Sequence, residues 1–134
     1  MMSSIVTVAM AGLLAAALPA LASARRVPEG EWGGAHARLD VHGTGARLEL
    51  DCAHGTIEGP LRLARGGRFR ASGRYQHERG PVVEEGAAAE GRPARYSGML
   101  KGNVLTLRIL TEDGQKLGPF RLERGARAEL VKCQ

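Results

Sequence analysis

The stretch of residues 37–52 reads A-R-L-D-V-H-G-T-G-A-R-L-E-L-D-C, and its alternation decides the fold class. Apolar and polar side chains alternate on both sides of Gly43-Thr44-Gly45. A period of two is typical of a strand with one buried face, and a short glycine-containing connection between two such runs is typical of a β-hairpin. The side chains predicted to face the core are Ala37, Leu39, Val41, Ala46, Leu48, Leu50 and Cys52.

The same alternation continues through most of the remaining chain. Further strands are predicted over residues 56–58, 68–78, 93–101, 104–111 and 115–123. Asp113-Gly114 indicates a type I′ hairpin turn, and residues 130–133 are predicted to be a closing strand or a tail. Residues 80–92 break the alternation with Gly, Pro and acidic residues and predict one long loop.

These runs amount to about eight short strands, neighbours in sequence being paired antiparallel, and almost no stretch keeps a helical period. With no helix to cover the apolar face, the sheet must close or fold on itself. We therefore predict an all-β fold in which a single antiparallel meander closes into a small β-barrel, with a β-sandwich as the runner-up. Glycines that fit the turns and sharp bends of such a barrel are Gly43, Gly45, Gly66, Gly67, Gly73, Gly98, Gly102, Gly114 and Gly118.

The first residues predict export. Residues 5–18 are almost wholly apolar, and the small residues of Leu21-Ala22-Ser23-Ala24 have the spacing that a signal peptidase requires. Residues 1–24 are therefore predicted to be a signal peptide, although residues 1–4 lack the usual basic patch. A retained transmembrane anchor is the weaker alternative, because a span needs about 20 apolar residues. Residues 25–134 would then form a single periplasmic or secreted domain with no membrane span.

The cysteines support the same compartment. The chain has two cysteines, Cys52 and Cys133, and in an exported protein they are most simply a disulfide. Closing a loop of about 80 residues stabilises the folded state by up to roughly 4–5 kcal/mol. An oxidised Cys52 is neither a nucleophile nor a thiolate ligand.

The charge pattern argues against a dedicated nucleic-acid site. The net charge is +5, but basic residues alternate with acidic ones, as in Arg47-Leu48-Glu49-Leu50-Asp51. Solvated strand faces explain this pattern more simply than a polyanion site does. An unspecific attraction to the acidic cell envelope stays open.

Two histidines are the weak candidates for a metal site. His54 follows Cys52 in a turn and would meet His36 across the first hairpin, with Asp51 nearby. Zinc or copper is conceivable for such a set, but no established ligand spacing supports it. The alternative for His54 is a turn residue hydrogen-bonded to the backbone.

The candidate ligand-binding residues are Phe69, Tyr75, His77 and Tyr96. His77 continues the predicted inner face of Phe69 and Tyr75, so it is either a partly buried imidazole at the barrel mouth or a polar contact to a ligand. No nucleophile motif, nucleotide loop or paired-carboxylate motif is present, and neither catalysis nor a cofactor is expected.

Gly30-Glu31-Trp32 resembles the G-x-W element that precedes the first strand of lipocalin-like (calycin) barrels. That resemblance implies that Trp32 closes the barrel floor under a basic residue, for which Arg121, Arg124 or Arg127 would serve. The chain also resembles small uncharacterised secreted bacterial proteins, through W-G-G-x-H, D-C-A-H-G-x-I and Y-S-G-x-L/V-x-G segments. The second resemblance implies a family and no activity.

Two functions follow from these observations as expectations. The first is an exported barrel that binds a small apolar or amphipathic ligand in its cup. The second is a surface-acting interaction module, such as an inhibitor or an envelope-associated protein, with a filled core. Few aromatic side chains are available, so the interior is expected to be small or filled.

Overall fold

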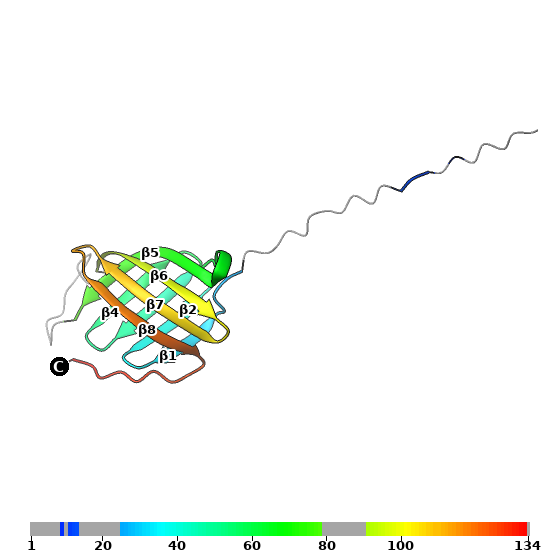
Figure 1. Cartoon of the computed structure of the whole chain (residues 1–134). Helices are drawn as coiled ribbons and strands as arrows, with labels where there is room; N and C mark the ends of the chain where they lie inside the picture. Colours follow the sequence, from blue (N-terminus) through cyan, green and yellow to red (C-terminus); the bar gives the residue numbers. More distant parts are fainter. Residues whose placement is uncertain (1–8, 10, 14–24, 79–90, 134) are drawn as a thin grey trace, which may run out of the picture.

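The computed structural model describes residues 9, 11–13, 25–78 and 91–133 (Figure 1). The predicted signal peptide lies almost wholly outside these described residues, as does most of the predicted loop over residues 80–92. The described chain forms one antiparallel sheet of eight strands that closes into a barrel in the order β1 to β8. The predicted all-β meander barrel is therefore confirmed, and the β-sandwich is not formed.

The strands are β1 (Gly30–Gly34), β2 (Ala37–His42), β3 (Gly45–Leu50), β4 (Ala53–Glu58), β5 (Arg68–His77), β6 (Arg92–Lys101), β7 (Val104–Thr111) and β8 (Lys116–Arg124). A 3-10 helix, η1 (Arg65–Gly67), precedes β5.

The opening hairpin forms as its alternation predicts. Leu39 of β2 lies opposite Leu48 of β3, and Ala37 lies opposite Leu50. All of these side chains are buried, whereas the intervening polar residues lie on the outside. A shift by one residue would turn every apolar side chain outward, so this pattern fixes the register of the pair.

The G-x-W element was predicted to stand ahead of the first strand, but it lies within β1. Trp32 pairs with Leu39 of β2 on one side and with Arg124 of β8 on the other, and this second pairing closes the barrel. Gly33 permits a close approach on the outside, because a Cβ there would lie 2.2 Å from the carbonyl oxygen of Ala126. The sequence pattern does not predict β1, because Gly33 and Gly34 interrupt the alternation of apolar and polar residues.

The turn at Asp113-Gly114 also differs from its prediction. A type I′ turn needs a positive φ at both central residues, but among the described non-glycine residues only His36 has one. Here the Gly114 amide donates to the Thr111 carbonyl, and Gly114 alone takes the left-handed conformation, with φ 86°. The longer connection places Gln115 at the end of the barrel.

One end of the barrel, which we call the floor, is covered by the chain itself. Residues 25–28 enter beside η1, and the Val27 amide donates to the Leu61 carbonyl at 3.0 Å (Figure 1). Both of these apolar side chains are buried. The Trp32 indole nitrogen donates to the Pro28 carbonyl at 3.0 Å, so the entering segment is held against the tryptophan.

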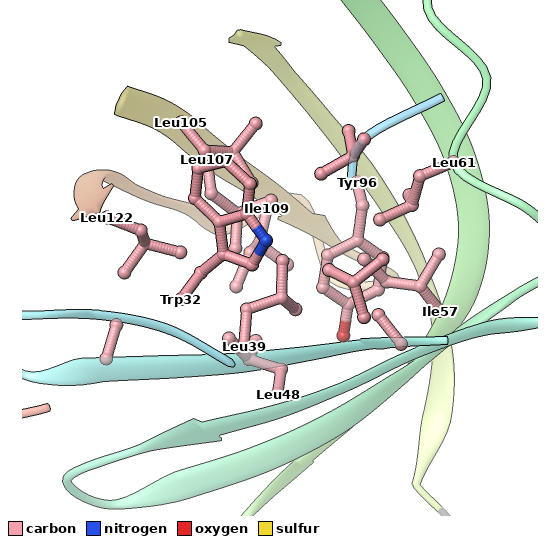
Figure 2. Close-up of a cluster of buried hydrophobic side chains, with 14 of the residues drawn as sticks. Trp32, Leu39, Leu48, Ile57, Leu61, Tyr96, Leu105, Leu107, Ile109 and Leu122 are labelled. Atoms are coloured by element: carbon pink, nitrogen blue, oxygen red, sulfur yellow. The ribbon is translucent and has the colours of Figure 1, made fainter. Parts of the chain in front are cut away.

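The interior is filled by two groups of side chains (Figure 2). Trp32 lies among Leu105, Leu107 and Leu122, and Tyr96 lies beside Ile57 and Leu61. Trp32 is 0% exposed and Tyr96 is 1% exposed. A barrel of about eight strands has an interior that side chains alone can fill, and these two rings do much of that filling.

Tyr96 of β6 fits because the next two strands, β5 and β4, carry glycine where its ring and hydroxyl lie against them. A Cβ at Gly73 would lie 2.9 Å from the Tyr96 ring, and one at Gly55 would lie 2.2 Å from its hydroxyl. The hydroxyl donates to the Arg74 carbonyl at 2.6 Å. Gly73, predicted to mark a bend, therefore makes room for an aromatic ring; Gly98 similarly lies against the Phe69 ring.

We expect Gly73→Ala to lower the free energy of unfolding by about 2 kcal/mol, because the added methyl group would collide with the Thr56 carbonyl oxygen, 1.9 Å from the position of the Cβ, and with the Tyr96 ring. Urea unfolding followed by circular dichroism measures this change, and Ser72→Ala on the outer face is the matched control. Equal stability of the two variants would contradict the packing described for Tyr96.

Candidate functional site

The end of the barrel opposite the floor is the mouth. It is formed by the connections at residues 35–36, 51–52 and 112–115, together with the end of β5 at His77 and the start of β6 at Arg92. No 3-10 helix or entering segment covers it within the described residues, in contrast to the floor. The mouth is therefore where inward-facing side chains come within reach of solvent.

Two adjoining depressions lie at the mouth. The larger has a volume of about 730 Å³ and is lined by Tyr75, His77, Arg92, Asp113 and Gln115, among others. The smaller has a volume of about 280 Å³ and shares Tyr75, His77 and Gln115 with it. Leu117 and Phe120 give the smaller one an apolar side. The mouth thus offers polar groups beside an apolar surface.

The four predicted ligand-binding residues separate into two pairs. Phe69 and Tyr96 are 2% and 1% exposed, and they fill the core. Tyr75 is partly buried and His77 is exposed, and both line the depressions at the mouth. Of the four, only Tyr75 and His77 line the mouth.

Tyr75 is held as a neutral phenol. Partial burial raises its pKa, and the Asp113 carboxylate raises it further. Asp113 in turn accepts a hydrogen bond from the Thr111 hydroxyl, which keeps the pKa of that carboxyl below its ordinary value. A neutral phenol can donate a hydrogen bond and an ionised carboxylate can accept one. The mouth therefore presents both functions within one depression.

The two candidate metal ligands take separate carboxylate partners. The His36 Nδ1 atom lies 2.6 Å from Asp51 Oδ2, and the His54 Nδ1 atom lies 3.0 Å from Glu78 Oε1. Over residues 25–78 and 91–133, no group of three or more His, Cys, Asp or Glu side chains is placed to hold a metal ion. The metal site stays a prediction from the sequence.

His36 has a structural task in the turn between β1 and β2. It takes the left-handed conformation, with φ 66°, which costs about 1 kcal/mol or more for a residue with a Cβ. Its amide donates to the Glu129 carbonyl at 2.8 Å, and its side chain contacts Asp51. These contacts compensate for the strained turn.

The C-terminal tail, residues 125–133, runs back along the outside of the barrel from the floor to the mouth (Figure 1). At the mouth the predicted Cys52–Cys133 disulfide is formed, with 5.1 Å between the two Cα atoms. The bridge joins the tail to the connection after β3, whereas the last sheet edge is closed by β1 and β8. The bridge therefore holds the tail and does not itself close the sheet.

Polar contacts hold the tail beside the disulfide, and we call this set the tail clamp: Asp51, Glu78 and Lys132. The Val131 amide donates to Asp51 Oδ1 at 2.8 Å. The Lys132 ammonium donates to the Leu50 carbonyl at 2.9 Å and lies 3.2 Å from Glu78 Oε2. The clamp therefore joins the tail to residues at the ends of β3 and β5.

The clamp favours ionised carboxylates. The hydrogen bond from the Val131 amide is the main cause that lowers the pKa of Asp51, and the contact with His36 adds to it. For Glu78, partial burial acts to raise the pKa, but the hydrogen bonds from His54 and Lys132 outweigh burial and lower it. Both groups therefore bind the tail best when they are charged.

Comparison of the chain with models of known protein families, with curated proteins and with solved structures found no match. The barrel is compatible with a lipocalin-like fold, and Arg124, one of the basic residues proposed from that resemblance, is the cross-strand partner of Trp32. Among the described residues, no helix has the length and apolar character needed to cross a membrane.

Several residues of the mouth were not predicted from the sequence. Gln115, Leu117 and Phe120 reach it because β8 returns to pair with β7, and Arg92 reaches it because β6 pairs with the end of β5. These neighbours are set by pairing between distant strands. One local signal is the alternation in residues 115–123, in which Phe120 shares a face with Leu122.

We expect reduction of the disulfide to lower the free energy of unfolding by up to about 4 kcal/mol, since the two cysteines lie 81 residues apart. Urea unfolding with and without dithiothreitol measures the effect. The Cys52→Ser/Cys133→Ser double variant is the control and should not respond to the reductant. A wild-type protein as stable with the reductant as without it would contradict the prediction.

We expect stability to fall in acid, in a way that depends on the tail clamp. A carboxyl whose pKa is lower in the folded state adds stability above its unfolded pKa and loses it as the pH falls through its folded pKa. The loss should therefore begin near the ordinary values of 3.8 for Asp51 and 4.5 for Glu78 and continue below them.

Urea unfolding over a series of pH values checks this expectation. The Asp51→Asn/Glu78→Gln variant should show a flatter dependence on pH than wild type, and Glu123→Gln, on the outer face of β8, is the control. The same slope in all three proteins would mean that the clamp does not couple stability to these carboxylates.

Proposed function

We propose that the chain is an exported binding protein that holds an amphipathic small molecule at the mouth, above a filled core. The observation that carries the proposal is the pair of depressions that share Tyr75, His77 and Gln115. The larger volume, about 730 Å³, falls within the roughly 300–1,000 Å³ of small-molecule sites, and the smaller, about 280 Å³, is just below that range.

The lining supports an amphipathic ligand. Leu117 and Phe120 offer apolar contact on the side nearer the core. Tyr75, Asp113 and His77 offer hydrogen-bonding groups on the solvent side. A ligand with an apolar body and a polar head would match both sides, whereas a purely apolar ligand would leave the polar groups without partners.

The packing of the core supports binding at the mouth rather than inside. Trp32, Leu105 and Leu107 are each 0% exposed, and the space between the walls is taken by side chains. A ligand could enter only by displacing such groups, and burying a large apolar side chain is worth about 1.5–3 kcal/mol. The ligand is therefore proposed to bind at the mouth, and not in a cup inside the barrel as the sequence analysis expected.

Export is supported by the disulfide and by the apolar leader sequence. The Cys52–Cys133 bridge is consistent with an oxidising environment outside the cytoplasm. Binding without catalysis is proposed, because the sequence carries no recognisable nucleophile or nucleotide motif.

A surface-acting interaction module is the second candidate function. The observation that favours it is again the filled interior, which leaves the outer faces and the two ends of the barrel as the available contact surfaces.

Titration of ¹⁵N-labelled protein with octanoate, octylamine and octyl glucoside tests binding at the mouth. These amphiphiles share an alkyl chain and differ in the charge of the head. We expect saturable chemical-shift changes centred on Tyr75, His77, Gln115 and Phe120 for at least one of them. Tyr75→Ala/His77→Ala should abolish these changes.

Arg47→Ala, on the outer face of β3, is the control and should bind as wild type does. Shift changes centred on core residues such as Leu105 would place the ligand in the interior instead. No saturable change with any of the three amphiphiles would reject the proposed small-molecule function and leave the second candidate.

A further inference from the structure

The closed barrel places many charged side chains beside opposite charges on neighbouring strands. On the wall formed by β2 and β3, Arg38 lies 3.2 Å from Glu49 and 3.7 Å from Asp40. Glu31 of β1 lies 4.0 Å from Arg38, and Glu58 of β4 lies 3.8 Å from Arg74. The acidic side chains of β1–β4 therefore already have cationic partners.

The floor end of the wall formed by β5, β6 and β7 is different. A trough of about 890 Å³ runs over its outer face near the floor, and five arginines contribute to its lining. These five residues, which we call the trough arginines, are Arg62, Arg65, Arg68, Arg70 and Arg108. No Asp or Glu of the described chain lines this trough. Its other polar side chains are the hydroxyls of Ser97 and Thr106, which also donate hydrogen bonds.

Strand pairing fixes the spacing of the trough arginines. Arg70 lies opposite Ser97, and Ser97 lies opposite Arg108, so the two arginines are two strands apart in one row. That separation is about 10 Å, and Arg68 lies about 7 Å from Arg70 along the strand. Arg62 and Arg65 approach from the connection that carries η1. The trough is therefore lined by arginines of β5, of β7 and of the connection before β5.

All five trough arginines are exposed. Within residues 25–78 and 91–133, none of their side chains forms an ion pair or a hydrogen bond. Nothing in this part of the fold neutralises them, although they repel one another at short range. The arrangement has no evident structural benefit, so a bound anion is the simplest source of a compensating interaction.

We propose that this trough binds a linear anionic polysaccharide. Guanidinium groups pair with carboxylate and sulfate in two-pronged geometry, and charges repeated along a polymer would meet the repeated arginines. This site lies on the outer wall, away from the mouth, and goes beyond the ligand binding proposed there.

The shape and composition of the trough favour a polysaccharide over two other polyanions. A flat bilayer would contact the rims of a concave trough and miss its base. Single-stranded nucleic acid binds through exposed aromatic side chains on which bases stack. Phe69, the one aromatic residue that lines the trough within the described chain, is 2% exposed and points into the core.

Binding of fluorescein-labelled heparin, a linear sulfated and carboxylated polysaccharide, tests the proposal over a series of salt concentrations. We expect wild-type affinity to fall steeply with salt, because binding releases counterions. Arg70→Gln/Arg108→Gln should weaken binding about tenfold and lower the slope of log affinity against log salt by about two.

Arg47→Gln/Arg127→Gln is the matched control, because it removes the same charge from exposed positions outside the trough. It should bind heparin within about twofold of wild type. Circular dichroism melting of both double variants establishes that they fold, and the octanoate titration should be the same for both, which separates this site from the mouth.

Three results would overturn the proposal. Wild type would fail to bind heparin, or both double variants would lose affinity equally, which would indicate an effect of net charge alone. In the third, a single-stranded DNA oligonucleotide or phosphatidylglycerol vesicles would bind through Arg70 and Arg108 more tightly than heparin does, and the partner would belong to that other class.

Discussion

The width of the barrel is the constraint on which the rest of the structure depends. A closed sheet of about eight strands leaves room inside for side chains and little else, and Trp32 and Tyr96 occupy much of that room. Gly55 and Gly73 leave space for Tyr96 in the barrel wall, since the Cβ of any larger residue at either position would collide with Tyr96. A protein packed in this way has only its ends and its outer walls with which to contact other molecules.

The sequence predicts those parts of the fold that depend on neighbouring residues. The hairpin of β2 and β3 follows from its alternation, and the disulfide follows from the cysteine count. The strand β1 could not be predicted, because Gly33 and Gly34 lack the apolar pattern that marks a strand. It exists because β8 and the tail pack against it, and such contacts between distant segments leave no local periodicity.

The candidate sites were predictable to a similar extent. Alternation placed Tyr75 and His77 on the face that leads to the mouth, but it could not show that Gln115 joins them. For the trough arginines a signal was present: residues 59–77 contain no Asp or Glu and carry Arg62, Arg65, Arg68 and Arg70. Arg108 lies far along the chain, and only the pairing of β6 with β7 brings it to this row.

The tail clamp helps to explain why one wall is left basic. Holding the tail against the barrel engages Asp51 and Glu78, and Lys132 also lies 3.4 Å from Glu49. These carboxylates lie at or near the mouth, where they contact the tail. At the floor end of the β5–β7 wall, the trough arginines form no such contacts within the described residues, whereas Arg74 and Arg92, farther along these strands, pair with Glu58 and Glu112. The contacts that stabilise the chain and those available to a partner are therefore on different faces, so a polyanion could bind without competing with the fold.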